Sequence, residues 1–318
     1  RQQVGAVLYL APASIPTDAN LTTLGLDSLM AMELLRHIEH DLQLRLFPRE
    51  VFERPSIDEL SVYLIGELDT HRGQAAQGPT QTSSAEALAR FAEKMFSGPA
   101  RTTGAEHAGP GVRNPSAVFL LSAPRSGSTL LRVMLAGHPA LFSPPELHLL
   151  PCDAMRQRKE DLGPAYLDEG LQMALMNLQG LTVEESKTLV EGWIAEDKPI
   201  QEVYRTLQEL AGGRTLVDKS PTYGISLATL ERAEALFEGA RYIHLVRHPY
   251  PAIESAARVR FDKLLGAGEV NPVEFGEQIW ATLNQNILEF AQKIGPERCC
   301  RVYYEELARD PESEMRRL

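Results

Sequence analysis

From residue 114 onward, short apolar segments alternate with segments of helical periodicity. Such alternation favours a parallel β-sheet that helices cover on both faces. In a sheet of this kind, ligands bind beyond the carboxyl ends of the strands. The sequence therefore predicts an α/β domain over residues 114–318, with its site at one edge of the sheet. The predicted strands are AVFLLS (117–122), TLVDKS (215–220), RYIHLVR (241–247) and CCRVYY (299–304).

The first predicted strand leads into the motif PRSGST and then into a helical pattern. Backbone N–H groups and hydroxyls at the start of a helix form a cradle for an anion. Gly127 allows the backbone to approach a ligand closely, and Arg125 adds a fixed charge. The motif by itself also fits a strand–turn–helix that binds nothing. The residues of this cradle are Arg125, Ser126, Gly127, Ser128 and Thr129.

Two further strand ends carry basic residues. Arg247 leaves a predicted strand, and Ser255 follows eight residues later on a helix predicted to start at Pro251. A guanidinium and a hydroxyl so placed can grip a second phosphate, whereas a surface ion-pair residue and a helix serine are the alternative. Lys219 lies at the third strand end, where pairing with Asp218 is its structural alternative.

The segment HPALFSPPELHLLP carries Glu146 and His148 two residues apart. In an extended segment this spacing directs both side chains to the same side. Apolar surroundings raise the pKa of a carboxyl group, whereas Arg125 and Lys219 would lower it. His148 has an intrinsic pKa closer to neutrality, so either residue can serve as a general base. A packed or solvated histidine is the structural alternative for His148.

Residues 1–68 form a separate helical unit. SIDEL restarts a helix at Ser56, with Glu59 in position for a capping box. Ser28 stands at the start of an earlier helix, after a glycine-containing loop. A phosphodiester on its hydroxyl would meet free N–H groups and the positive dipole end of that helix, and a plain N-cap is the alternative. The predicted apolar face of this helix consists of Leu29, Met32, Leu35, Ile38 and Leu42.

Residues 69–113 are rich in Gly, Pro, Thr and Ala, as is typical of a flexible linker. Within them, SAEALARFAEKMF places Leu88, Phe91 and Met95 on one face of a short helix. This helix either docks on a neighbour or stays free.

Charge and cysteine content exclude several classes of function. A net charge of −11 over 318 residues disfavours a general nucleic-acid or membrane surface, and the apolar runs are too short to span a bilayer. The three cysteines, two of them adjacent, indicate no disulfide framework and fit a reducing cytoplasm. Without an initiator Met, and with a last segment of helical pattern, both ends are expected to be cut from a longer polypeptide.

The stretch TTLGLDSLMAMELLRHIEHDLQLRL, followed by FERPSIDELSVYL, resembles the acyl carrier domains of modular polyketide synthases. The resemblance implies a small all-α carrier domain over residues 1–68, with a phosphopantetheine arm on Ser28. Only RQQVGAVLYL precedes the usual loop. The carrier domain is therefore expected to be partial, with a shortened first helix.

Residues 115–318 resemble the sulfotransferases that use 3′-phosphoadenosine 5′-phosphosulfate (PAPS) and release 3′-phosphoadenosine 5′-phosphate (PAP). PRSGSTLL is similar to the tyrosylprotein and heparan-type members. The resemblance implies an α/β domain with a parallel sheet and a P-loop-like core that needs no metal. The family's C-terminal basic loop, which completes the 3′-phosphate site, is not visible before Leu318, so this domain is also expected to be shortened.

The same resemblance assigns roles to single residues. Lys219 matches a lysine that contacts the bridging oxygen of the bond being broken, and Arg125 assists it. Glu146 matches the catalytic glutamate of the tyrosylprotein-type members, with His148 as its partner or substitute. The residues implied to hold PAPS are Arg125, Ser126, Gly127, Ser128 and Thr129 at the 5′ end, Arg247 and Ser255 at the 3′-phosphate, and Tyr304 near the adenine.

Together the two resemblances imply part of an olefin-forming polyketide synthase. The expected reaction moves a sulfuryl group from PAPS to the β-hydroxyl of the carrier-tethered acyl chain. A downstream thioesterase would later decarboxylate that chain to a terminal alkene. Neighbouring synthase modules are expected partners, and nucleic acid and membranes are not.

Three alternatives to this function stay open. The first is a sulfotransferase that acts on the hydroxyl of a free small molecule. The second is a P-loop-like kinase, and the third is a non-catalytic docking module of the synthase. A kinase predicts a loop lysine and an aspartate for Mg²⁺, and the loop has no lysine. A docking module predicts loss of Glu146, Lys219 or Arg247, and all three are present.

Overall fold

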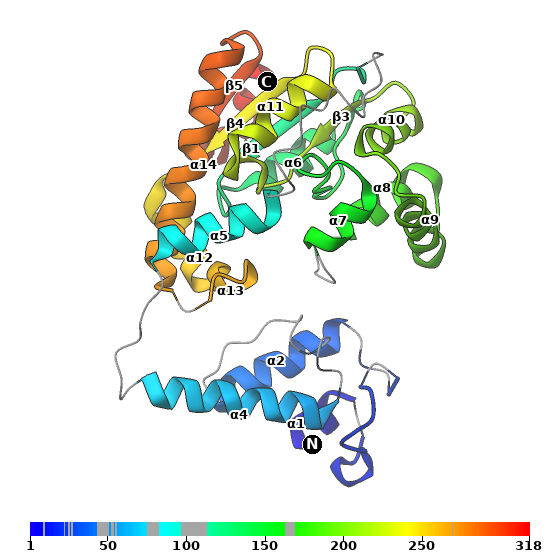
Figure 1. The fold of residues 1–318 in the computed structure, drawn as a ribbon, viewed down its shortest axis with the longest axis vertical. Coiled ribbons are helices and arrows are strands. Elements are labelled where there is room, and N and C mark those ends of the chain that lie inside the picture. Colours follow the sequence, from blue (N-terminus) through cyan, green and yellow to red (C-terminus); the bar gives the residue numbers. More distant parts are fainter. Residues whose placement is uncertain are drawn as a thin grey trace. The chain divides into compact units, whose positions relative to one another are not determined.

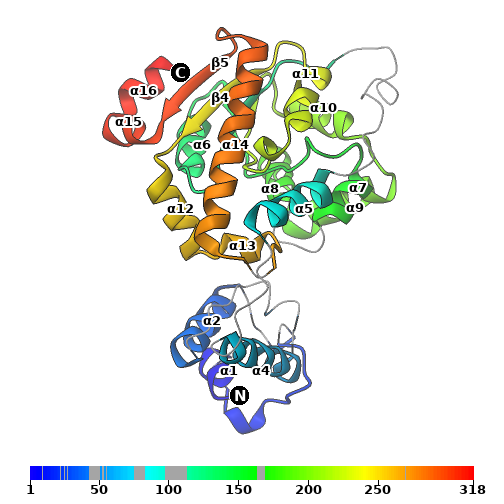
Figure 2. The ribbon, with the colours of Figure 1, turned by 60° about the vertical axis from the view of Figure 1, so that its left-hand side comes forward.

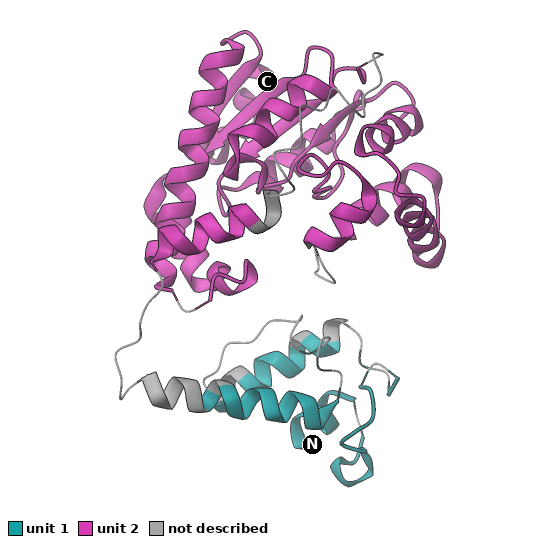
Figure 3. Cartoon of the chain, viewed as in Figure 1, with its two compact units in different colours: residues 1–80 teal, residues 81–318 magenta. Residues whose placement is uncertain are grey.

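The computed structural model describes two compact units, residues 1–80 and 81–318 (Figure 3). The described residues are 1–8, 10–21, 23, 24, 26, 28–42, 51, 54, 56–74, 83–96, 113–162, 169–268 and 270–318. Most of the predicted linker, residues 75–82 and 97–112, lies outside them. No helix among the described residues is long and apolar enough to cross a bilayer.

The first unit is helical, as predicted. Its helices are α1 (Gln2–Leu8), the short η1 (Pro12–Ser14), α2 (Ser28–Leu42) and α4 (Ile57–Gln74) (Figure 1). The capping box before α4 is confirmed, because Glu59 N donates to Ser56 Oγ at 3.2 Å and Ser56 N donates to the Glu59 carboxylate at 3.4 Å. Ser28 begins α2, but its side chain lies outside the described residues.

The predicted apolar face of α2 is observed in part. Leu35 and Ile38 are buried, together with Leu34, whereas Leu42 at the end of the helix is 37% exposed. The side chains of the other two predicted members, Leu29 and Met32, lie outside the described residues.

The second unit contains the predicted parallel sheet. Among its described residues, five strands pair in the order β2-β3-β1-β4-β5, and every pair is parallel. Four of them coincide with the strands predicted from the apolar segments. The fifth, β2, spans only two residues, which is too short for a sequence period to reveal. The strands are β1 (Val118–Ser122), β2 (Leu141–Phe142), β3 (Thr215–Asp218), β4 (Arg241–Val246) and β5 (Cys299–Tyr303).

Helices cover both faces of this sheet because successive side chains of a strand point to opposite sides. Phe119 and Leu121 of β1 enter a core that contains residues of α10, α11 and α14. Leu120, between them, enters a second core with residues of α6 and α15. Figure 2 shows α14 running along one face of the sheet. The bounds are α6 (Ser128–Ala136), α7 (Met155–Leu162), α8 (Glu169–Gln179), α9 (Val183–Ala195), α10 (Ile200–Leu210), α11 (Leu227–Leu236), α12 (Pro249–Arg258), α13 (Phe261–Leu264), α14 (Pro272–Ile294), α15 (Tyr304–Arg309) and α16 (Pro311–Arg317), with a 3₁₀ turn, η3, at Tyr223–Ile225.

The helix predicted inside the linker is α5 (Ser84–Phe96), and it packs on the second unit. Leu88 and Phe91 are buried in one core cluster with residues of α14 and with Ala123, which directly follows β1. The side chain of Met95, the third predicted member of this face, lies outside the described residues. Helix α5 therefore backs the edge of the sheet at which the site lies.

Candidate active site

The glycine loop after β1 has the backbone of an anion cradle. Gly127 caps α6 with a φ of 89°, and Arg125 has a φ of 64°, so both adopt the left-handed conformation. Ser126 and Ser128 are buried. The Ser126 hydroxyl has no hydrogen-bond partner among the described residues. An unsatisfied buried donor at a helix N-terminus is what an anion site provides before it is filled.

Tyr304 lies directly on this loop. A Cβ atom at Gly127 would stand 2.3 Å from Cδ2 of the Tyr304 ring. The guanidinium carbon of Arg247 lies 4.6 Å from the centre of the same ring. Only glycine permits this approach, so loop, tyrosine and arginine form one cluster.

Arg247 and Ser255 both reach the loop residue Arg125. Arg247 Nη1 donates to the Arg125 carbonyl at 2.9 Å, and Arg125 Nε donates to Ser255 Oγ at 3.0 Å. Arg247 Nε is buried and has no partner among the described residues. The structure thus joins Arg125 to Ser255, although the resemblance assigns them to opposite ends of PAPS. The helix that carries Ser255 begins at Pro249 and not at the predicted Pro251.

Lys219, Glu146 and His148 form a second cluster, in which Glu146 is the middle member. Lys219 Nζ is ion-paired with Glu146 Oε1, and His148 Nε2 lies 3.2 Å from Glu146 Oε2. His148 Nδ1 lies 3.3 Å from Thr222 Oγ1. Lys219 therefore pairs with Glu146 and not with its neighbour Asp218. His148 is buried, whereas the Glu146 side chain is 34% exposed.

These contacts decide the protonation of the cluster. Burial by itself would raise the pKa of Glu146, but the hydrogen bond from His148 and the charge of Lys219 outweigh it and lower the pKa to about 2. A carboxylate can only accept hydrogen bonds, so Nε2 of His148 carries a proton. In neutral His148, Nδ1 then accepts the Thr222 hydroxyl. Glu146 consequently keeps the accessible oxygens, while both ring nitrogens of His148 are engaged.

Comparison with known proteins identifies the second unit. The model of the sulfotransferase family matches residues 115–318, more than half of the chain. The chain belongs to the sulfotransferase family. The phosphopantetheine attachment site model matches residues 1–64, so this sulfotransferase also carries a phosphopantetheine-attachment domain.

Solved structures support the same fold for the sulfotransferase. The sulfotransferase domain of the Synechococcus PCC 7002 olefin synthase is 50% identical, with a TM-score of 0.61 over 65% of this chain and 72% of that one. The sulfotransferase domain from the curacin biosynthetic pathway is 51% identical, with a TM-score of 0.63 over 65% and 73%. Protein-tyrosine sulfotransferase A of Caenorhabditis elegans is 23% identical over 203 residues, which are 63% of this chain and 48% of that protein. The chain thus spans about half the length of this curated relative.

The sulfotransferase site includes residues that the sequence analysis missed. The positive charge of Arg132, on α6, acts on Glu146, and its Nη1 donates to the Ser143 carbonyl at 2.9 Å. Gly170 of α8 lies against the Glu146 backbone, since a Cβ there would stand 1.9 Å from the Glu146 carbonyl oxygen. The place of Arg132 on the helix that follows the loop was a usable signal. Nothing in the sequence around Gly170 marks its contact.

His244 of the sulfotransferase is a structural residue. It is buried on β4, and its Nε2 lies 3.0 Å from Asn284 Oδ1. Burial lowers the pKa of His244 to about 4. It is therefore neutral near pH 7 and takes no part in the clusters described above.

Proposed function

We propose that this sulfotransferase moves a sulfuryl group from PAPS to the β-hydroxyl of a polyketide acyl chain on the phosphopantetheine arm of Ser28. The main support for the proposal is that groups suited to bind an anion and groups suited to accept a proton lie at the ends of three adjacent strands. β3, β1 and β4 are neighbours in the sheet, and they lead to Lys219, the glycine loop and Arg247. The attachment domain and the olefin-synthase and curacin-pathway relatives support a tethered acceptor.

The residues present fit PAPS. The Ser126 hydroxyl and Arg247 Nε lack hydrogen-bond partners among the described residues, so both are available to anionic oxygens. PAPS, when bound, supplies the activated sulfuryl group. We assign its 5′-phosphosulfate to Arg125, Ser126, Gly127, Ser128 and Thr129, its 3′-phosphate to Arg247 and Ser255, and its adenine to the neighbourhood of Tyr304.

We propose that Glu146 accepts the proton of the acceptor hydroxyl. It is the most exposed of the three residues in its cluster. Its pKa of about 2 makes it a weak base while Lys219 is bonded to it. A turn of Lys219 toward the leaving oxygen would remove a cation from Glu146 and raise that pKa. His148 would continue to hold Glu146 through Nε2.

Lys219 and Arg125 are proposed to offset the charge that grows on the leaving oxygen. Cations of this kind lower the barrier by stabilising the charge of the transition state. Removing one such donor from a water-excluded site costs about 3–4 kcal/mol of transition-state stabilisation. Lys219 meets that description, since its side chain is almost fully buried.

The wider setting follows from the same proposal. We assign residues 1–68 to the carrier, 69–113 to a linker and 114–318 to the sulfotransferase domain. Free cysteines fit a cytoplasmic protein. Neighbouring synthase modules would deliver the acyl chain, and a downstream thioesterase would consume the sulfated product.

Mass spectrometry of the chain tests this function. The phosphopantetheine arm on Ser28 is loaded with a β-hydroxyacyl group and incubated with and without PAPS. We expect one sulfuryl group on the arm, only when PAPS is present. In the matched variant Ser28→Ala, the same acyl group is supplied as a free pantetheine thioester. This reaction gives the rate of sulfation of an untethered acceptor.

Each alternative has its own outcome, in this experiment or in calorimetric titration with PAP and ADP. Equal sulfation rates for free and tethered acyl groups would favour a free small-molecule acceptor. Calorimetric binding of ADP in place of PAP would favour a kinase. Binding of neither nucleotide would favour a docking module.

A further inference from the structure

Asp218, the last residue of β3, is fully buried beneath the Lys219–Glu146–His148 cluster. Its carboxylate accepts hydrogen bonds from three hydroxyls. Ser220 Oγ donates to Oδ1 at 3.0 Å, and Tyr204 and Tyr223 donate to Oδ2 at 2.6 and 2.8 Å. A buried carboxylate is costly unless its oxygens are satisfied. Its placement therefore calls for an explanation beyond packing.

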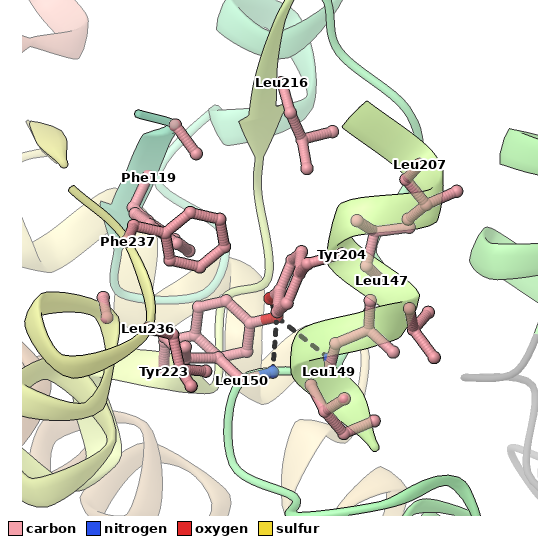
Figure 4. Packing of buried hydrophobic residues seen from close by; sticks show 14 of the residues in the cluster. Phe119, Leu147, Leu149, Leu150, Tyr204, Leu207, Leu216, Tyr223, Leu236 and Phe237 are labelled. Carbon is pink, nitrogen blue, oxygen red and sulfur yellow. Dashed lines mark hydrogen bonds between the residues drawn. The ribbon is translucent and has the colours of Figure 1, made fainter. Parts of the chain in front are cut away.

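Two of these three hydroxyls also hold the segment that carries the proposed base. Ser220 Oγ accepts from His148 N at 3.0 Å. Tyr223 OH accepts from Leu149 N at 3.0 Å and from Leu150 N at 3.3 Å (Figure 4). Three consecutive backbone N–H groups of a segment outside any strand are thus satisfied by two side chains.

The hydrogen bonds that join Tyr223 to Asp218 and to the segment have fixed directions. A phenol has one proton and two acceptor sites. Tyr223 gives its proton to Asp218 and receives the two N–H groups of Leu149 and Leu150, and its oxygen also lies 3.3 Å from the Tyr204 oxygen. Tyr204 also gives its proton to Asp218 and packs in the same core as the segment, but among the described residues no hydrogen bond joins it to the segment. The carboxylate of Asp218 thus orients the Tyr223 oxygen toward the backbone.

The backbone that this network holds is strained. His148 has a φ of 48°, a left-handed conformation that non-glycine residues adopt only where their surroundings impose it. On the other side of the segment, buried Arg158 donates from Nε and Nη2 to the Leu147 carbonyl at 3.2 and 2.9 Å. The peptide groups around His148 are therefore fixed from two directions.

We propose that Asp218, acting through Ser220 and Tyr223, is a positioning residue that fixes Glu146 and His148 against Lys219. The term Asp218 clamp denotes Asp218, Ser220 and Tyr223. Asp218 and Ser220 flank Lys219 at the end of β3, and Tyr223 follows in η3, so one short stretch of chain carries both the clamp and the cation of the ion pair. The proposal rests on the proposed function in one respect, namely that a residue of the Glu146–His148 segment accepts the proton of the acceptor hydroxyl. It does not depend on which of the two residues is the base.

Two conservative substitutions separate positioning from stability. Tyr223→Phe and Tyr204→Phe each remove one hydroxyl from the same oxygen of Asp218, and both side chains are fully buried. Only Tyr223→Phe also releases the N–H groups of Leu149 and Leu150. Sulfation in a single turnover is measured for both at saturating PAPS and acceptor, together with calorimetric PAP affinity and thermal unfolding.

We expect Tyr223→Phe to slow the single turnover by about 10²-fold, the scale at which a misplaced catalytic group costs rate. PAP affinity should stay within about twofold of wild type in both variants, because neither tyrosine touches the glycine loop. Tyr204→Phe should lose stability to a similar degree but keep a rate within about threefold. Equal slowing by both variants, or an unchanged rate in Tyr223→Phe, would overturn the proposal.

Amide hydrogen exchange gives a readout that does not need turnover. Tyr223→Phe should speed exchange at the Leu149 and Leu150 amides, and Tyr204→Phe should not. If the wild-type chain sulfates no acceptor, the proposed function fails while this difference still supports the clamp. Unchanged protection of both amides in Tyr223→Phe would overturn the clamp even in an active enzyme.

Discussion

The two halves of the candidate site differ in whether their polar side chains have hydrogen-bond or ion-pair partners within the protein. The anion half, the glycine loop with Arg247, Ser255 and Tyr304, contains a hydroxyl and a guanidinium nitrogen that have no partner among the described residues. In the proton half, Lys219, Glu146 and His148 are bonded to one another and held by the Asp218 clamp. The anion half therefore keeps polar atoms that a ligand could bind, whereas under the proposed function the proton half releases Lys219 from Glu146 as the proton is taken.

This difference separates binding from rate. Substitutions in the anion half should weaken the nucleotide and leave the proton transfer intact once the site is saturated. Substitutions in the proton half should slow the reaction and leave the nucleotide affinity unchanged. A residue whose substitution changes both would show that the halves are coupled.

Glu146→Gln should give the largest effect. A general base contributes about 10²–10⁴ in rate, and glutamine keeps the size of the side chain while removing its basicity. Single-turnover sulfation should fall by that factor with PAP affinity unchanged. Glu160→Gln, at an exposed position of α7, is the control.

His148→Ala tests the competing assignment in the same assay. A near-wild-type rate for Glu146→Gln, together with a lost rate for His148→Ala, would make His148 the base. Activity in both variants would mean that the proton leaves by another route.

Phe91→Ala should destabilise the core that lies behind the anion half. Phe91 lies before residues 115–318, which the sulfotransferase family model matches. Phe91 of α5 is buried in the same core cluster as Ala123, which comes directly before the glycine loop in the sequence. Truncating a buried phenylalanine costs about 3–5 kcal/mol of unfolding free energy. Thermal or urea unfolding should show this loss, and Arg90→Ala on the exposed side of α5 should not. A stability equal to wild type would mean that α5 is dispensable.

The sequence predicted the anion half better than the proton half. PRSGST is a local motif whose function depends on consecutive backbone groups at a helix start, so it can be recognised without tertiary structure. Arg247 and Ser255 could also be proposed from the sequence, because Arg247 lies at a strand end and Ser255 lies eight residues later on the following helix. Even so, their bonding to Arg125 was not predictable, since the chain separation is 122 and 130 residues.

The proton half depends on contacts that no local pattern encodes. Lys219 and Glu146 are 73 residues apart, and their pairing left Asp218 to the hydroxyls of Tyr204 and Tyr223. The sequence offered Asp218 as the partner of Lys219 because the two are adjacent. Successive residues at a strand end point to opposite sides, and that geometry gives them different partners.

Arg247→Ala should produce a smaller effect, confined to binding. Loss of a charge-assisted hydrogen bond costs roughly 1.5–3 kcal/mol. Calorimetry should show that loss for PAP, and almost none for adenosine 5′-phosphosulfate, which lacks the 3′-phosphate. Arg241→Ala, at the opposite end of β4, is the matched control. Equal weakening of both ligands would remove Arg247 from the 3′-phosphate site.

His244→Gln should give the smallest effect, a change in how stability depends on pH. It separates the protonation of His244 from that of the proton half. Burial holds the pKa of His244 at about 4, below its ordinary value of 6.5. Between these values the unfolded chain binds a proton that the folded chain does not. Stability is therefore fully present above about pH 6.5 and is lost as the pH falls toward 4. One proton corresponds to a slope of at most about 1.4 kcal/mol per pH unit.

Urea unfolding between pH 4 and 7 measures this slope. It should be shallower in His244→Gln than in wild type, and unchanged in His138→Gln, whose side chain is exposed. Glu146, with its pKa of about 2 against an ordinary 4.5, titrates below this window. Its ion pair adds stability above pH 4.5 that disappears as the pH falls toward 2. If the slope between pH 4.5 and 6.5 were as steep in His244→Gln as in wild type, it would come from neither residue, and the assignment of His244 as the buried neutral histidine would be wrong.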